Sequence, residues 1–334
     1  MRRTALFLAA GLALAMVVPS TASATCGAEG CPCVPNGLSG SRFSFDVRTL
    51  DVTQDQLWRG GHAASLQSAI GSTTVHHGVP LLTRTRTWSL EGRMQVNDRV
   101  RLSASLPYLD REHRRFDAHT ALYDEALIQS WRFKGLGDAT ALVHMKAYEP
   151  FGGPRVSVRA GAKLPTGRTQ VPLGNGLIPS EIQPVLRPGS GSWDLIAGAS
   201  VSQRLPWEPV MPLGLDVQRR WNGKGTEDYR AGDELQANLS SGWVVRPGFA
   251  LTALANYAQH GGDSWTAPTA SDPYRHPAHG GSRGLYLTPG ANVSLPGGMG
   301  LYAAWQNRVW GTSGHAEVVA RNYLLLGLSY SQRN

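Results

Sequence analysis

The stretch Arg99-Val100-Arg101-Leu102-Ser103-Ala104-Ser105-Leu106 alternates apolar side chains with charged or hydroxyl-bearing ones. Because successive side chains of a β-strand point to opposite faces, such a strand has one apolar and one polar face. The same alternation returns in Arg155-Val156-Ser157-Val158-Arg159-Ala160-Gly161-Ala162-Lys163-Leu164. Both stretches therefore predict strands of a sheet that separates an apolar from a polar environment.

The pattern recurs along the chain, and its runs are joined by alternately short and long connections. We expect strands near residues 42–51, 82–96, 98–108, 136–149, 154–165, 192–205, 211–220, 233–245, 248–258, 284–295, 299–310 and 321–331. The short connections carry turn residues: Asn97-Asp98, residues 150–153, residues 206–209, Arg246-Pro247 and Pro296-Gly297-Gly298. Short turns at one rim and long loops at the other are typical of outer-membrane barrels, whose short turns face the periplasm.

We therefore predict an all-β fold, an antiparallel transmembrane β-barrel of about 12 strands, with ten or fourteen if the early loops hide a strand. The predicted runs reach the length of about 9–11 residues that crosses hydrocarbon at a tilt. A secreted sandwich or soluble barrel is the alternative, with the apolar face inward. Aromatic residues near strand ends or on the apolar face favour contact with lipid: Trp88, Tyr108, Trp243, Tyr257, Trp305, Trp310 and Tyr330.

The N-terminus has the features of a secretion signal. Arg2 and Arg3 precede an apolar run that ends in Thr21-Ala22-Ser23-Ala24, a pattern that signal peptidase cuts. We expect a signal peptide over 1–24, a Cys-bearing periplasmic tail over 25–40 and the barrel over 41–334, located in the bacterial outer membrane; a retained helix is the alternative. The net charge of +8 falls to +6 without Arg2 and Arg3, which suits lipopolysaccharide or anionic solutes rather than nucleic acid.

Three short motifs lie in the middle of the chain. They are Gly135-Leu136-Gly137-Asp138, Lys163-Leu164-Pro165-Thr166-Gly167 and Gly189-Ser190-Gly191-Ser192-Trp193-Asp194. Their order resembles the family of outer-membrane transporters named for the meta-pathway of phenol degradation. The resemblance implies a channel or transporter barrel for small, hydrophobic or aromatic compounds. Pro165 would end strand pairing, and Gly167 would turn the chain into an external loop.

Basic residues predominate on the expected inner face of the barrel. The lumen-lining candidates are Arg93, Arg99, Arg101, His144, Lys146, Arg155, Arg159, Lys163, Arg220 and Arg308. Rings of Arg and Lys in a narrow pore favour anions, so we predict passive passage of small solutes with a modest preference for anions. Pairing of these residues with carboxylates that fill the interior is the alternative. A non-conducting barrel that acts as a surface anchor or as a scaffold for a periplasmic partner also stays open.

No catalytic motif stands out, and we expect neither an enzyme nor a cofactor. Cys26, Cys31 and Cys33 are the candidates for a metal site, with a disulfide or an uncommitted tail as alternatives. The histidines of the predicted loops are weaker metal candidates. The C-terminal run from Tyr323 to Tyr330 resembles a barrel's closing strand, so the assembly machinery is an expected partner, beside outer-membrane lipid and small solutes.

Overall fold

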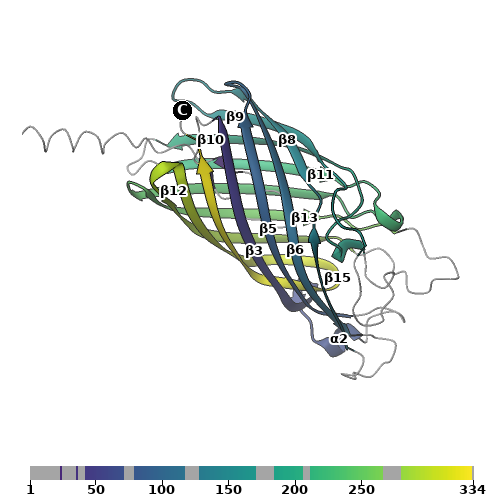
Figure 1. The fold of residues 1–334 in the computed structure, drawn as a ribbon. Helices are drawn as coiled ribbons and strands as arrows, with labels where there is room; N and C mark the ends of the chain where they lie inside the picture. The colour runs from purple at the N-terminus through teal and green to yellow at the C-terminus, as the bar shows by residue number, and fades with distance from the viewer. Residues whose placement is uncertain are drawn as a thin grey trace, which may run out of the picture.

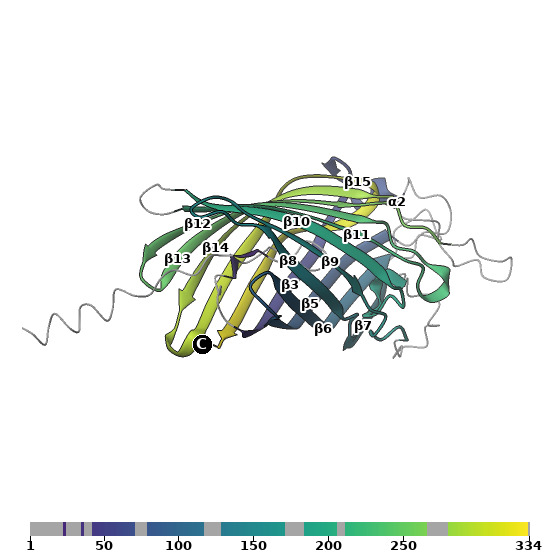
Figure 2. The same cartoon turned by 90° about the horizontal axis from the view of Figure 1, so that it is seen from above.

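The computed structural model describes residues 23–24, 35–36, 42–70, 79–116, 128–170, 184–205, 211–265 and 280–332. These residues form a closed, strongly tilted barrel (Figures 1 and 2). Its strands are β3 (Phe43–Gly60), β4 (His62–Ala63), β5 (Val79–Gln95), β6 (Val100–Phe116), β7 (Ile128–Leu136), β8 (Thr140–Tyr148), β9 (Arg155–Lys163), β10 (Asp194–Leu205), β11 (Met211–Trp221), β12 (Glu234–Arg246), β13 (Phe249–His260), β14 (Ser282–Ser294) and β15 (Met299–Ser331).

The remaining elements are short. They are the pair β1 (Ser23–Ala24) and β2 (Pro35–Asn36), helix α2 (Leu66–Ile70), and the 3-10 turns η3 (Pro184–Leu186), η4 (Thr226–Asp228) and η5 (Pro296–Gly298). Among the described residues, no helix has both the length and the apolar character needed to cross a membrane.

Each long strand pairs antiparallel with its neighbours in sequence, and β15 closes the circle against β3. Two parts of the barrel depart from a simple sequence of one strand after another. β7 and β8 pair with successive halves of β6 and form one interrupted strand. The 33-residue β15 pairs with β14 through its first half and with β3 through its second. With the two-residue β4 set aside, the described residues contain twelve crossing strands, as predicted.

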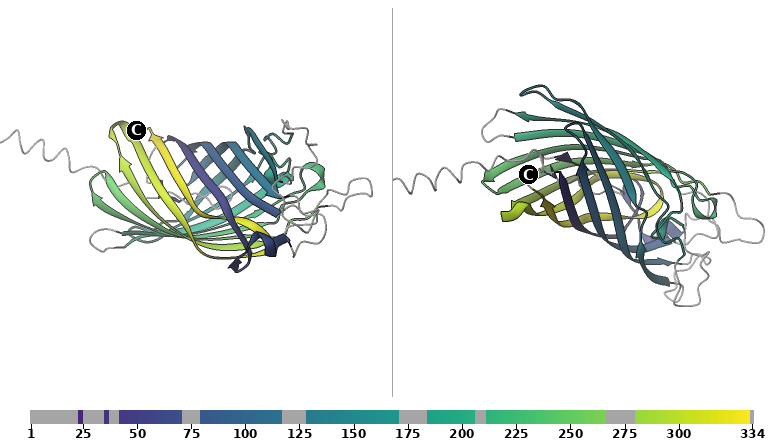
Figure 3. Two further views of the ribbon diagram at one scale, coloured as in Figure 1. Left: turned by 90° about the horizontal axis from the view of Figure 1, so that it is seen from below. Right: turned by 45° about the horizontal axis from the view of Figure 1, so that its top comes forward.

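The seam between the two ends of the barrel is well packed inside. The hydroxyl of Tyr302 donates to Asp46, with distances of 2.8 and 2.9 Å to the two carboxylate oxygens. The Tyr302 ring also lies on Gly327, where an added Cβ would be 2.0 Å from Cζ. Residues 302 and 327 thus place the two halves of β15 side by side, next to β3 (Figure 3).

The barrel wall has an apolar outer face and a polar inner face, as membrane barrels do. Leu102, Leu106 and Tyr108 are 36 to 40% exposed on β6, whereas the polar residues between them turn inward. The predicted aromatics Trp88, Trp243, Trp305, Trp310 and Tyr330 are likewise exposed. In contrast, Asp194, Asp216, Asn238, Asn256 and Gln306 are at most 3% exposed. A soluble barrel would show the reverse distribution, because burial of apolar surface stabilises it.

Four of the predicted short turns lie together at one rim, whereas the turn predicted at residues 206–209 lies outside the described residues. Asn97 accepts the backbone N–H groups of Arg99 and Val100 at 2.9 Å. Gly248 and Gly297 take positive φ angles of 79° and 75°, which suit tight turns. Ser331 also reaches this rim, and α2 lies at the opposite end (Figure 1). The rim with the short turns is therefore the periplasmic one.

Several strands continue beyond their predicted ends at the other rim. β3 runs to Gly60 rather than residue 51, β6 runs to Phe116, and β7 occupies a stretch that we expected to be loop. The connection expected between 310 and 321 is also strand, within β15. Outside the membrane, the outer face of a strand contacts water and no longer needs apolar residues. The alternation of apolar and polar residues therefore disappears there, although the backbone hydrogen bonds between the strands continue.

Candidate functional site

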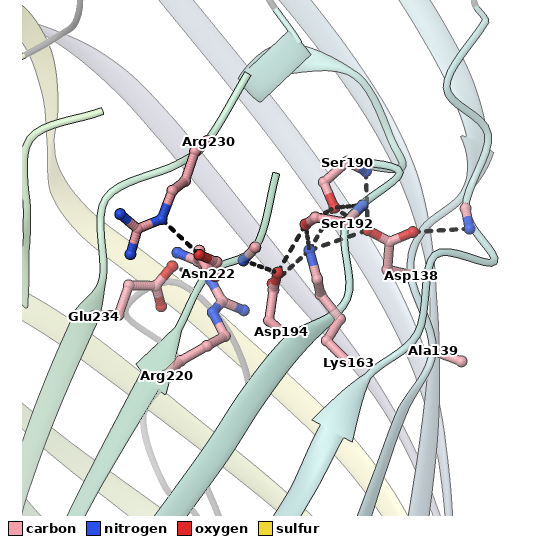
Figure 4. Close-up of polar contacts among 12 residues, drawn as sticks. Asp138, Ala139, Lys163, Ser190, Ser192, Asp194, Arg220, Asn222, Arg230 and Glu234 are labelled. Atoms are coloured by element: carbon pink, nitrogen blue, oxygen red, sulfur yellow. Dashed lines mark hydrogen bonds and ion pairs between the residues drawn. The ribbon is translucent and has the colours of Figure 1, made fainter. Parts of the chain in front are cut away.

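The three sequence motifs meet at one hydrogen-bonded junction (Figure 4). Lys163, the last residue of β9, is its centre. Its ammonium lies 2.6 Å from Asp194 Oδ2 and 3.2 Å from Asp138 Oδ2. It also donates to the hydroxyls of Ser190 and Ser192. One buried cation therefore holds two carboxylates that come from different motifs.

The two carboxylates in turn fix the backbone around them. Asp138 accepts the N–H of Gly167 at 2.9 Å and the N–H of Ser190 at 2.8 Å. Asp194 accepts the hydroxyl of Ser192 at 2.7 Å and the N–H of Gly223 at 3.1 Å. Buried carboxylates are stable only with such partners. The junction thus joins the ends of the β9–β10 connection to β8 and to the residues that follow β11.

The glycines of the motifs have a packing role. Gly167 and Gly189 cross in backbone contact, so that a Cβ on Gly189 would lie 2.3 Å from the carbonyl carbon of Gly167. Arg168 donates its N–H to Leu136 O at 2.8 Å, and Gly189 donates to Arg168 O at 2.9 Å. The segment after β9 therefore lies against the end of β7, whose strand partner among the described residues is β6.

Further contacts hold the residues that precede β10 to other parts of the barrel wall. Arg111 on β6 donates to Leu186 O at 2.7 Å, and Arg187 pairs with Glu227 at 2.8 Å. The N–H of Thr226 donates to Ser190 O at 3.0 Å. The described residues before β10 are thus held to β6 on one side and to η4, which follows β11, on the other.

A second cluster crosses the middle of the barrel. Arg159 on β9 binds both carboxylate oxygens of Asp216 on β11, at 2.6 and 2.8 Å, and it donates to Gln218 at 2.9 Å. Asn238, Asn256 and Gln306 continue the polar contacts around the inner wall from β12 to β15. Each of the three is at most 1% exposed. Side chains therefore fill the interior at this level.

The periplasmic half of the interior is more basic. Glu91 pairs with Arg93 at 2.7 Å and with Arg48 at 3.6 Å. Arg101 donates to Gln95 at 2.9 Å, and Arg93 and Arg155 are near enough to repel its guanidinium. This part of the wall carries more cations than carboxylates to match them.

The structure places the lumen-lining candidates as follows. The inner wall carries Arg93, Arg101, His144, Arg159, Lys163 and Arg220. Lys146 and Arg155 share Glu149 near the periplasmic rim, and Arg308 stacks on Trp58 at 5.0 Å. Arg99 is exposed in the turn between β5 and β6. Arg99 directly precedes β6, which starts at Val100.

Some inner residues were not among the candidates. Arg111 and His113 lie on the extension of β6, and Arg187 lies in the β9–β10 connection. Neighbouring residues there are polar on both faces, so no alternation could separate inner from outer positions. Cys26, Cys31 and Cys33 lie outside the described residues. Among the described residues, no group of three His, Cys, Asp or Glu side chains could hold a metal ion.

Solved structures with the same architecture are known. The COG4313 outer membrane channel from Pseudomonas putida F1 is similar with a TM-score of 0.58 at 15% identity, over 88% of this chain and 97% of that chain. The transport unit of the autotransporter AIDA-I from Escherichia coli gives a TM-score of 0.49 at 8% identity, over 90% and 93% of the two chains. The likeness to the COG4313 channel shows a shared fold. A search of curated protein sequences gave no match.

The comparison with protein families is more specific. The profile of the family described as "Putative MetA-pathway of phenol degradation" matches residues 125–316. This range contains all three motifs of the junction, and it confirms the resemblance inferred from them. Because the match covers more than half of the chain, the protein belongs to this family.

Proposed function

We propose that the protein is an outer-membrane channel for the passive passage of small molecules, with small anions, aromatic ones included, as its solutes. The observation that carries the proposal is the inverted polarity of the barrel, which has an apolar outer surface and a charged inner wall that is basic in its periplasmic half. Rings of Arg and Lys in a confined pore attract anions and repel cations. The family description, which names phenol degradation, and the solved outer membrane channel support this role.

The basic periplasmic half would act as the selective part of the pathway. Arg93 and Arg155 both act on the guanidinium of Arg101 there. Glu91 and Glu149 offset only part of the positive charge, because Arg93, Arg101, Lys146 and Arg155 outnumber them. The level of Arg159 and Asp216 would be the narrow point, because its side chains are almost fully buried. Passage of a solute would then require these side chains to move.

Planar-bilayer recordings of the purified mature protein test the proposal. We expect discrete conductance steps, and a reversal potential in a salt gradient that indicates a preference for anions. The variant R93Q/R101Q/R155Q should lose that preference. The matched control R42Q/R246Q removes exposed arginines at the periplasmic rim, beside the start of β3 and at the end of β12, and should keep it.

The buried middle of the barrel favours a second candidate, a closed barrel that anchors a periplasmic partner. Gln306 and Asn256 are fully buried inside the barrel, as expected of a plug of side chains. The tail over residues 25–40, which we propose to face the periplasm after cleavage behind Ala24, would contact the partner. The two candidates differ in the bilayer experiment: stable insertion without conductance, and without swelling of liposomes in small solutes, would favour the closed barrel.

A further inference from the structure

A group of charged residues lies on the outer wall of the barrel, on four adjacent strands. Asp51 on β3, Arg86 on β5, Asp110 on β6 and Lys134 on β7 are register partners in one row. Arg84, Glu112 and Arg132 form the next row toward the extracellular end. We call Arg84, Arg86, Arg132 and Lys134 the outer-wall basic cluster.

The acids of these rows hold the cations in place. Arg86 binds Asp51 at 2.7 Å, and Arg84 approaches the same oxygen at 3.4 Å. Asp110 takes two hydrogen bonds from Arg132, at 2.7 and 2.9 Å, and an ion pair with Lys134 at 3.2 Å. Each of the two carboxylates is shared by two cations. Each trio therefore keeps one positive charge in excess.

The cations of the outer-wall basic cluster are more exposed to solvent than the carboxylates that pair with them. The side chains of the basic cluster are 46 to 62% exposed, whereas Asp51 is 25% exposed and Asp110 is 9% exposed. The carboxylates thus lie against the sheet, and the cations project from it. A ligand that approaches the wall meets ammonium and guanidinium groups first.

The position of the cluster relative to the membrane is defined from both sides. Directly below it on the same strands, Trp88 and Tyr108 are register partners with ring centroids 6.0 Å apart, and they face outward as interfacial aromatics do. Arg86 lies over the Trp88 ring at 6.0 Å. Above it, Phe116 and Val79 are buried, and the partly buried Leu66 and Ile128 pack against them. The cluster occupies the band between, within about 15 Å of the aromatics along the strands.

We propose that the outer-wall basic cluster binds the phosphorylated headgroup of a glycolipid of the outer leaflet, of the lipid A type. At the height of the interfacial aromatics, the anionic groups next to the wall are lipid phosphates. Arginine and lysine are the side chains that bind phosphate best, arginine through two parallel hydrogen bonds. The cations of β5 and those of β7 are two strand spacings apart, about 10 Å, which suits two phosphates on one disaccharide.

The assignment does not depend on whether the barrel conducts solutes. It concerns an outer surface, and the proposed pathway runs inside. A loss of lipid binding and a loss of conductance would therefore be separate results, obtained with different variants.

Native mass spectrometry of the folded mature protein in detergent tests the proposal, with bisphosphorylated lipid A as the probe. The variant R84Q/R86Q/R132Q/K134Q should bind this lipid about tenfold more weakly or worse, since each basic residue near an anionic surface adds to affinity. Dephosphorylated lipid A should bind the unmodified protein as weakly as the variant binds the probe. The matched control R42Q/R246Q should bind normally, because Arg42 and Arg246 also lie near aromatic rings, at 5.8 Å, but at the periplasmic end.

Three results would overturn the proposal. The first is unchanged affinity in the quadruple variant. The second is an equal loss in R42Q/R246Q, which would indicate general charge attraction. The third is equal competition by phosphatidylglycerol, which would indicate any anionic lipid. If the quadruple variant does not fold, R84Q/R86Q and R132Q/K134Q serve in its place, and normal binding by both would also contradict the proposal.

Discussion

Arg159 on β9 reaches over Gly198 on β10 to form a two-point ion pair with Asp216 on β11. The register places Gly198 directly between Arg159 and Gln218. Both charged side chains are 4% exposed, and the two N–O distances are 2.6 and 2.8 Å. An arginine can cross a strand in this way because glycine leaves room for its guanidinium. This ion pair is the centre of the polar cluster that fills the middle of the barrel.

Removing one partner of this pair should destabilise the barrel. In D216N the guanidinium of Arg159 would lose its buried counter-charge, a change that typically costs about 3–5 kcal/mol. In R159M/D216M no charge is left without a partner, and the loss should be smaller. The free energy of unfolding in urea, followed by heat-modifiable gel mobility, distinguishes the two variants. Equal stability of D216N and the unmodified protein would show that the pair is not needed for folding.

Gly198 should tolerate no side chain. In G198A the new Cβ would lie 2.7 Å from Val217 O and 3.0 Å from Arg159 Nε, so the guanidinium or the sheet must shift. Overpacking of this kind costs about 1–3 kcal/mol. G92A is the matched control, because its Cβ would meet Phe45 at an ordinary 3.7 Å. If both alanine variants melt at the same temperature, the contact at Gly198 does not constrain Arg159.

The sequence was sufficient to predict the barrel, its strand count and its periplasmic rim. Alternation was clear wherever the outer face contacts lipid, as on Leu102 and Leu106 of β6. Beyond Tyr108 the same strand continues through Asp110, Glu112 and Arg114, which are polar like the residues between them. Periodicity of hydrophobicity cannot locate a strand that has water on its outer face and polar groups on its inner face.

The side-chain networks were beyond sequence reasoning for a different reason. Lys163, Asp138 and Asp194 were each recognised as motif or inner-face residues, but their meeting depends on the break between β7 and β8 and on the crossing of Gly167 with Gly189. The partner of Arg159 depended on register, which places Asp216 two strands away. The sequence alone does not show whether Arg159 faces an open lumen or pairs with a carboxylate, because it does not give the register of the strands.

Lys163 should fasten the connection between β9 and β10. K163M would leave Asp138 and Asp194 as two buried carboxylates without their shared cation, so the segment after β9 should detach. We expect faster limited proteolysis of residues 164–193, with the barrel still folded by gel mobility. K224M is the control, because Lys224 is exposed in the connection between β11 and β12. Unchanged cleavage in K163M would contradict the role of the junction.

Glu149 in a periplasmic turn should make stability depend on acidity. Hydrogen bonds from Lys146 and Arg155 lower the pKa of the Glu149 carboxyl from its ordinary 4.5. A carboxyl with a lowered pKa in the folded state stabilises the fold above its unfolded pKa, and this contribution disappears as the pH falls through the folded value. The melting temperature should therefore fall less steeply below about pH 4.5 in E149Q than in the unmodified protein. Parallel curves for the two proteins would rule this coupling out.

The most direct measurement for the proposed channel is the unit conductance of R159S/D216S beside that of the unmodified protein in the same planar bilayer. The double variant shortens both side chains at the narrow point and leaves the net charge unchanged. If the lumen is the solute pathway, discrete steps occur in both proteins, and the steps of the variant are larger with the anion preference kept. Stable insertion of both proteins with no conductance in either would contradict a channel and leave the closed barrel as the function.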